Sequence, residues 1–191
     1  MIRLGVLGST RGTDLQHILD AIQNNALDAK VVVVISNKKN AFILERARKN
    51  NIPDIFVPHT GKTRNEFDRE ITAALLKYSA DLVLLICFMR ILSEEFCRKW
   101  QDRLLNVHPS LLPKYAGGVD TNVHEKVLRN GDMETGCTIH FVTEEVDAGP
   151  ILIQKKCVVT RADTVESLKK KVQQLEGVAF IEALEMIANQ Y

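Results

Sequence analysis

Residues 31–36 read Val-Val-Val-Val-Ile-Ser, and this run constrains the fold more than any other part of the chain. An unbroken β-branched run is typical of a strand that buries both faces inside a parallel sheet. Shorter apolar runs follow the same pattern at residues 2–7, 55–57, 82–86 and 104–107. Amphipathic segments separate these runs, so the sequence predicts an α/β fold with an open, mostly parallel twisted sheet flanked by helices.

The amphipathic segments carry apolar residues at the spacing of helices. They predict helices after Asp14 and over residues 41–50, 63–77 and 94–100. The last third of the chain differs, because residues 138–143 and 151–159 alternate like antiparallel strands. It ends in residues 164–188, which predict a long amphipathic helix.

Length and charge limit the possible functions. The 191 residues fit one α/β domain, so we predict a single domain over 1–191 with a weak seam near residues 100–103. With 25 basic and 24 acidic residues, the net charge of +1 argues against nucleic-acid binding by bulk charge. No apolar stretch approaches the ~20 residues of a membrane helix. We expect a cytoplasmic protein that binds neither nucleic acid nor membranes.

A glycine-containing turn, Gly8-Ser9-Thr10-Arg11-Gly12-Thr13, separates the first predicted strand from the first helix. Backbone N–H groups at a helix start can bind phosphate, which makes this turn a candidate phosphate site. It matches neither G-x-G-x-x-G nor the Walker pattern, and Thr13 or Asp14 can equally serve only as a helix cap. The Asp14 carboxylate would repel a phosphate, and Arg11 could offset that repulsion.

Asn106 and His108 flank one residue at the end of a predicted strand, so both side chains lie on the same face. An amide that donates to a developing oxyanion, beside an imidazole that moves a proton, suits acyl transfer. The alternative is an ordinary histidine bonded to backbone. Asp147, in the turn at residues 146–150, is the candidate third group, since a nearby carboxylate favours the imidazolium. Its alternative is a common turn aspartate.

Other catalytic chemistries lack their patterns. There is no G-x-S-x-G turn for a serine nucleophile, and Ser110 follows a proline as a turn residue would. Cys87 lies in an apolar run, which predicts a buried, inert thiol. The cysteines form no C-x-x-C pair and no two histidines have metal-ligand spacing, so we predict no metal site. Direct transfer without a covalent enzyme intermediate remains.

The segment Asn-Val-His-Pro-Ser-Leu-Leu-Pro at residues 106–113 resembles the N-x-H-P-S-L-L-P pattern of the folate-dependent formyltransferases. The likeness runs from residue 6 to about residue 176. Supporting stretches in the same order lie at residues 36–38, 45–47, 88–93, 140–143 and 146–150. Several independent stretches in order are more specific than a single motif.

The resemblance implies transfer of the formyl group of 10-formyltetrahydrofolate to the amine of 5-phosphoribosylglycinamide. The products would be formylglycinamide ribonucleotide and tetrahydrofolate, in de novo purine biosynthesis. Transfer would be direct, through a tetrahedral intermediate, with small molecules as the partners and the protein a monomer or homodimer. The half at about 1–100 would bind the nucleotide, and the half at about 101–191 would bind folate and carry the catalytic residues.

The resemblance also implies roles for individual residues. His108 would transfer protons, Asn106 would polarise the formyl oxygen, and Asp147 would favour the imidazolium and arrange water. The phosphate would bind at Gly12, Thr13 and Asp14, and the ribose at Gln173 and Glu176. Folate would contact Arg64, Met89, Arg90, Ile91, Leu92, Asn106, Val142 and Glu144, with residues 144–149 closing over the pterin.

Two departures and three alternatives accompany the resemblance. The family's first turn often reads G-N-G-S-N, whereas Asp14 replaces the final amide here. Residues 115–124 also lack a family histidine, so His124 receives no catalytic role.

A hydrolase that uses water as acceptor usually has an extra N-terminal domain, and a methionyl-tRNA formyltransferase has a C-terminal RNA-binding domain. We expect neither domain. A non-catalytic nucleotide-binding module would leave Asn106, His108 and Asp147 unexplained.

Overall fold

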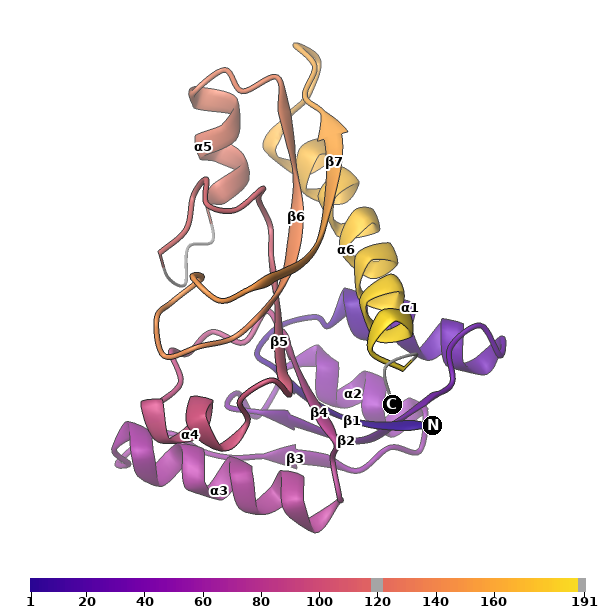
Figure 1. Cartoon of the computed structure of the whole chain (residues 1–191), viewed down its shortest axis with the longest axis vertical. Coiled ribbons are helices and arrows are strands. Elements are labelled where there is room, and N and C mark those ends of the chain that lie inside the picture. The colour runs from indigo at the N-terminus through magenta and orange to yellow at the C-terminus, as the bar shows by residue number, and fades with distance from the viewer. Residues whose placement is uncertain (118–121, 189–191) are drawn as a thin grey trace.

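The computed structural model describes residues 1–117 and 122–188 and centres on a seven-stranded sheet in the order β3-β2-β1-β4-β5-β6-β7 (Figure 1). The first five strands pair in parallel, whereas β6 pairs antiparallel with both β5 and β7. The predicted fold class is therefore confirmed. The strands are β1 (Ile2–Gly8), β2 (Ala29–Ser36), β3 (Asp54–Phe56), β4 (Leu82–Ile86), β5 (Leu104–His108), β6 (Glu134–Phe141) and β7 (Ile151–Val158).

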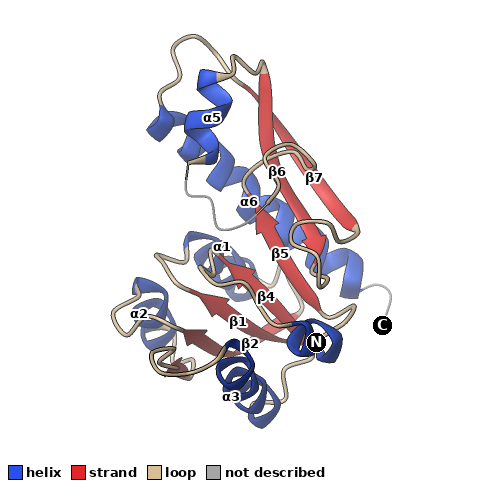
Figure 2. Ribbon diagram, turned by 90° about the vertical axis from the view of Figure 1, so that its left-hand side faces the viewer, coloured by secondary structure: helices blue, strands red, loops and turns tan. Residues whose placement is uncertain are grey.

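Six helices connect and cover these strands in the described part of the chain (Figure 2). They are α1 (Thr13–Gln23), α2 (Phe42–Lys49), α3 (Arg64–Lys77), α4 (Glu94–Lys99), α5 (Val123–Arg129) and α6 (Val165–Ala188). Helix α5 was not predicted, and β6 begins at Glu134 instead of residue 138. None of the helices in residues 1–117 and 122–188 is long and apolar enough to cross a membrane.

Strand β2 is buried on both faces of the sheet, as the valine run predicts. All residues of 31–36 are buried. One apolar cluster joins Leu4 and Val34 to residues of α1, α2 and α6, and a second joins Val33 and Ile35 to residues of α3 and α4. Alternate side chains of β2 thus contact different helical layers, which fixes the register of this strand.

Three parallel strands end next to one another, and hydrogen bonds join the residues that follow them. The Ser9 hydroxyl, after β1, donates to Asn37 Oδ1, after β2, at 2.6 Å. The same hydroxyl accepts from the backbone N–H of Met89, after β4, at 2.8 Å. The strand order reverses between β1 and β4, the position at which α/β sheets bind ligands. The fold therefore places a binding site at this edge.

The sheet also continues across the predicted seam. Leu104 of β5 pairs directly with Val83 of β4, so residues 100–103 join two neighbouring strands of one sheet. The division of the chain into a nucleotide-binding half and a folate-binding half stays a prediction.

Candidate active site

A cavity of about 430 Å³ opens at the carboxyl ends of β1, β4 and β5 and extends to α6. It brings together nearly every residue that the sequence analysis singled out. These are Gly12, Thr13, Asp14, Met89, Arg90, Ile91, Leu92, Asn106, His108, Val142, Glu144, Asp147, Gln173 and Glu176. The exception is Arg64, which lines a separate hollow with Asn65, Ser93, Glu94, Glu95 and Arg98.

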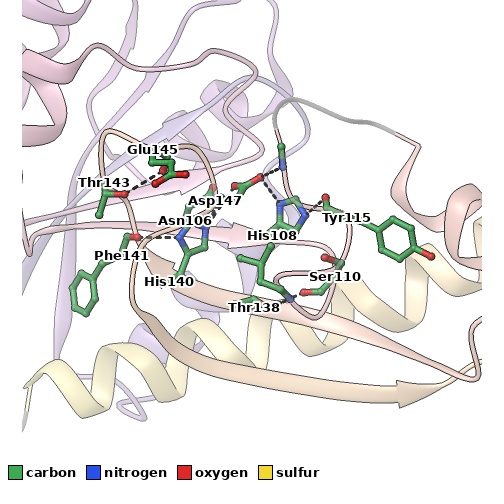
Figure 3. A network of polar contacts seen from close by, with 12 residues as sticks. Asn106, His108, Ser110, Tyr115, Thr138, His140, Phe141, Thr143, Glu145 and Asp147 are labelled. Atoms are coloured by element: carbon green, nitrogen blue, oxygen red, sulfur yellow. Dashed lines mark hydrogen bonds and ion pairs between the residues drawn. The ribbon is translucent and has the colours of Figure 1, made fainter.

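The three predicted catalytic side chains meet in this cavity (Figure 3). Asn106 and His108 lie on β5, opposite His140 and Thr138 of β6, which confirms that the pair shares one face. The segment between β6 and β7 carries Asp147 back over β5, and Asp147 adopts a left-handed backbone with φ of 55°. Such strain in a non-glycine residue is concentrated at functional sites.

The His108 ring contacts an oxygen on each side. Its Nε2 lies 3.0 Å from the carbonyl oxygen of Tyr115, and its Nδ1 lies 3.4 Å from Asp147 Oδ2. The backbone N–H of Gly117 donates to the same carboxylate oxygen at 3.1 Å. A carbonyl oxygen only accepts, so Nε2 carries a proton, and the protonated ring is the form that satisfies both contacts. The geometry therefore suits a histidine that gives up a proton.

His140 is a member of this group that the sequence analysis did not single out. Its Nδ1 lies 2.9 Å from the Phe141 carbonyl oxygen and donates to it, which leaves Nε2 to accept from Asn106 Nδ2 at 3.1 Å. Burial, its largest influence, lowers the pKa of His140 and keeps the ring neutral, although Asp147 acts in the opposite direction. His140 thereby fixes the orientation of the Asn106 amide and leaves its second N–H for a ligand.

One wall of the cavity is apolar. It contains Phe88, Leu92 and Val107, which are buried, and Ile91, which is 44% exposed. The guanidinium of Arg90 lies over the Phe67 ring at 4.5 Å, so its charge faces a core aromatic. A flat heterocycle with polar edges fits a wall of this kind.

The helix start of α1 forms another part of the cavity. Gly12 has φ of 65°, and a Cβ on it would lie 2.4 Å from Ile43, so no side chain fits there. Arg11, Lys38 and Lys169 line the cavity and add positive charge to that of the helix N-terminus. Lys38 and Lys169 were not singled out from the sequence, where they look like surface residues of a loop and a helix.

Two further side chains in the cavity qualify the sequence analysis. Cys87 has φ of 47° and is exposed, so the expectation of a buried thiol is wrong, but desolvation by surrounding protein raises the pKa of Cys87 to about 12. The thiol is therefore protonated and inert. His124 also lines the cavity, and burial lowers the pKa of His124 to about 4. Residues 118–121 of the divergent segment lie outside the described residues.

Comparisons with known proteins show to which family the chain belongs. A family model described as formyl transferase matches residues 2–184. The trifunctional purine biosynthetic protein adenosine-3 of Bos taurus is 44% identical over 98% of this chain, which spans 18% of that protein's length. The phosphoribosylglycinamide formyltransferase of Escherichia coli K12 is 42% identical over 92% of this chain and 82% of its own.

A solved structure gives the same result for the fold. Glycinamide ribonucleotide transformylase 1 from Symbiobacterium toebii superposes with a TM-score of 0.94 at 37% identity, over 100% of this chain and 89% of that chain. The family model covers nearly all of the sequence, and the strand-end amide, imidazole and carboxylate lie within it. The chain belongs to the formyl transferase family.

Proposed function

We propose that this protein transfers the formyl group of 10-formyltetrahydrofolate to the amine of 5-phosphoribosylglycinamide, in purine biosynthesis. The observation that carries the proposal is the meeting of Asn106, His108 and Asp147 in one cavity. That cavity has an apolar wall and a basic helix start. The names of the Escherichia coli and Symbiobacterium relatives support the same acceptor and the transfer of a formyl group.

The cavity has a place for each substrate. The N-terminus of α1 at Gly12, Thr13 and Asp14 would hold the phosphate, and Gln173 and Glu176 on α6 would bind the ribose. The wall formed with Met89, Ile91 and Leu92 would hold the pterin. The formyl oxygen would then lie at the free N–H of Asn106. Arg64 would meet the folate tail from its separate hollow.

The residues divide the chemistry between them. The amine nitrogen attacks the formyl carbon while Asn106 Nδ2 donates to the oxygen that gains charge. His108, protonated on both ring nitrogens, would exchange the contact of Nε2 with the Tyr115 carbonyl for one with the substrate, and would give the Nε2 proton to the folate nitrogen as the bond between that nitrogen and the formyl carbon breaks. The ring then regains a proton from the amine, so no proton is gained or lost overall. Asp147 holds the ring and its charge through the contact with Nδ1.

The proposal implies further properties. The protein would act in the cytoplasm on small molecules, as a monomer or homodimer. Residues 144–149 would close over the pterin, and the contact between Glu144 and Arg98 of α4 gives this segment an anchor outside the cavity.

One assay separates the proposed transferase from the alternatives. The protein is mixed with 10-formyltetrahydrofolate, with and without 5-phosphoribosylglycinamide, and folate deformylation is followed. Turnover that requires the nucleotide is the expected result. Turnover without it would identify a hydrolase, and no turnover under either condition would favour a binding module.

A further inference from the structure

Asp14 is buried in the cavity without the partners that a buried carboxylate needs. It lies in the first turn of α1, is 2% exposed, and lines the cavity. Its Oδ1 accepts no hydrogen bond from any residue in the described part of the chain. An ionised carboxylate in such a position loses hydration at Oδ1 and gains no hydrogen bond at that oxygen in exchange.

Asp68 is a buried carboxylate of this protein that does accept a hydrogen bond, and it serves as a comparison for Asp14. It is 3% exposed, like Asp14, but the backbone N–H of Ser93 donates to its Oδ2 at 2.6 Å. Burial raises the pKa of Asp68 as well, but hydrogen bonds from Ser93, together with Arg90 and Arg64, oppose this rise. Asp14, by contrast, has no hydrogen-bond donor at Oδ1 among the described residues. Its environment therefore suits a protonated carboxyl.

A second buried carboxyl group lines the same cavity and is close enough to Asp14 to be repelled by it. Glu176 of α6 is 5% exposed and lines the same space. Burial raises the pKa of Asp14 to about 7. Burial, followed by repulsion from Asp14, raises the pKa of Glu176 well above its usual range. Two neighbouring carboxylates in a desolvated site cannot both ionise at little cost, so such a pair binds a proton as a unit.

The other charged or titratable groups around this pair do not remove the effect. Lys169 of α6 is the cation that favours the ionised form of Glu176. Burial is the largest influence on the raised pKa values of Cys87 and Cys137, with both carboxylates adding to it. The remaining groups are His17 of α1, whose Nδ1 approaches Gly177 of α6, and the cavity-lining Arg11, Lys38 and His124.

We propose that Asp14 and Glu176 share one proton at neutral pH, and that the Asp14 carboxyl uses it to donate a hydrogen bond to the phosphate held at the start of α1. A protonated carboxyl is an O–H donor, whereas a carboxylate only accepts. Asp14 would thus act toward phosphate as the amide of the usual family turn would, and the expected repulsion disappears. The ligand's identity rests on the proposed function. The shared proton does not.

The shared proton is tested first in the free protein. Carboxyl 13C chemical shifts are followed from pH 4 to 9 in the unaltered protein and in Asp14→Asn, with Asp20→Asn as matched control. Asp20 is an exposed aspartate on the same helix. We expect the carboxyl signal that is absent from Asp14→Asn to titrate near pH 7 in the unaltered protein and in Asp20→Asn, and the Glu176 signal to titrate at lower pH in Asp14→Asn than in the unaltered protein, because the repulsion from Asp14 is gone. If all carboxyls titrate below pH 5, the inference is wrong whatever the protein's activity.

The contact with phosphate is tested by calorimetry with 5-phosphoribosylglycinamide between pH 6 and pH 8.5. Relative to Asp14→Asn, the affinity of the unaltered protein should fall about 30-fold over this range, as its donor ionises. Titration of the ligand's own phosphate cancels in this ratio, and Asp20→Asn should follow the unaltered protein. A ratio independent of pH would overturn the contact. Nucleotide binding without formyl transfer would instead count against the proposed function.

Discussion

At the scale of single residues, the site depends on which nitrogens carry protons. His140 is neutral and accepts from Asn106, whereas His108 has an acceptor oxygen at each ring nitrogen. The two histidines on neighbouring strands therefore differ: His140 orients the Asn106 amide, and His108 is the residue to which the proposed mechanism assigns proton transfer. Substitutions at these positions should affect catalysis more than folding.

His108→Ala removes the proton-transfer group, and we expect turnover to fall by about 10²- to 10⁴-fold. The substitution leaves β5 paired on both sides, so the far-ultraviolet circular dichroism spectrum should be unchanged. The measurement is nucleotide-dependent formyl transfer, with His59→Ala as control because His59 is exposed and outside the cavity. Full activity in His108→Ala would remove the mechanism.

Asp147→Asn keeps the size of the side chain and removes the charge beside His108 Nδ1. The imidazolium loses its counter-ion, so turnover should fall by about 10²-fold while the dissociation constant for folate changes much less. The pH dependence of turnover should also change, because the charge beside the ring is lost. Steady-state rates from pH 5 to 9 test this, and an unmoved profile would argue that Asp147 only positions the loop.

At the scale of elements, the segment after β6 has little freedom because Gly149 passes close to that strand. A Cβ at Gly149 would lie 1.9 Å from the backbone oxygen of Phe141, so any side chain forces the segment away. Gly149→Ala should therefore displace Asp147 and lower turnover, with nucleotide affinity nearly unchanged. Gly61→Ala is the control: its positive φ of 77° makes an alanine there strained too, but a Cβ at Gly61 has nothing within 4 Å and so displaces no neighbour. Equal turnover in the two variants would show that the segment adapts without moving Asp147.

Periodicity predicts the elements that are long and regular, such as the buried strands and the C-terminal helix, because each has a repeating apolar face. It does not predict α5, which spans seven residues, or the start of β6 at Glu134-Thr135-Gly136. These last residues form a strand because β7 pairs with them, and a Cβ at Gly136 would lie 1.8 Å from the Lys155 oxygen. Pairing between distant segments overrides local preference there.

The same distinction holds within the site. Strand alternation alone predicts that Asn106 and His108 share a face, and a resemblance to a family was needed to add Glu176 and Gln173. His140 and Lys169 were missed because their places depend on the pairing of β5 with β6 and on the packing of α6. The predicted antiparallel strand over 138–143 already contains His140. The pairing of that strand with β5, which places His140 opposite Asn106, is the signal that would have identified His140.

At the scale of the whole molecule, the buried pair of Asp14 and Glu176 makes stability depend on pH. An unfolded chain releases the Asp14 proton near the ordinary pKa of 3.8. The folded protein, in which burial raises the pKa of Asp14 to about 7, keeps this proton to higher pH. Between these values the folded state binds more protons, so the free energy of unfolding falls as pH rises. The stability that the folded state gains from holding the Asp14 proton is fully present below pH 4 and is lost above pH 7.

Asp14→Asn should therefore gain stability relative to the unaltered protein as pH rises from 5 to 8. Urea unfolding at pH 5, 6.5 and 8 measures the difference, with Asp20→Asn as the control that should show no such trend. Parallel curves for the unaltered protein and Asp14→Asn would mean that Asp14 is ionised in the fold throughout.

Strand β5 has a parallel neighbour on one side and an antiparallel one on the other. The amide of Asn106 meets His140 across backbone-paired strands, so this half of the site is assembled as soon as the sheet forms. The carboxylate of Asp147 reaches His108 only through a turn. One half is thus as rigid as the sheet itself, whereas the other depends on a short segment, so substitutions in residues 142–150 can change the contact with His108 while the backbone pairing that brings Asn106 to His140 stays in place.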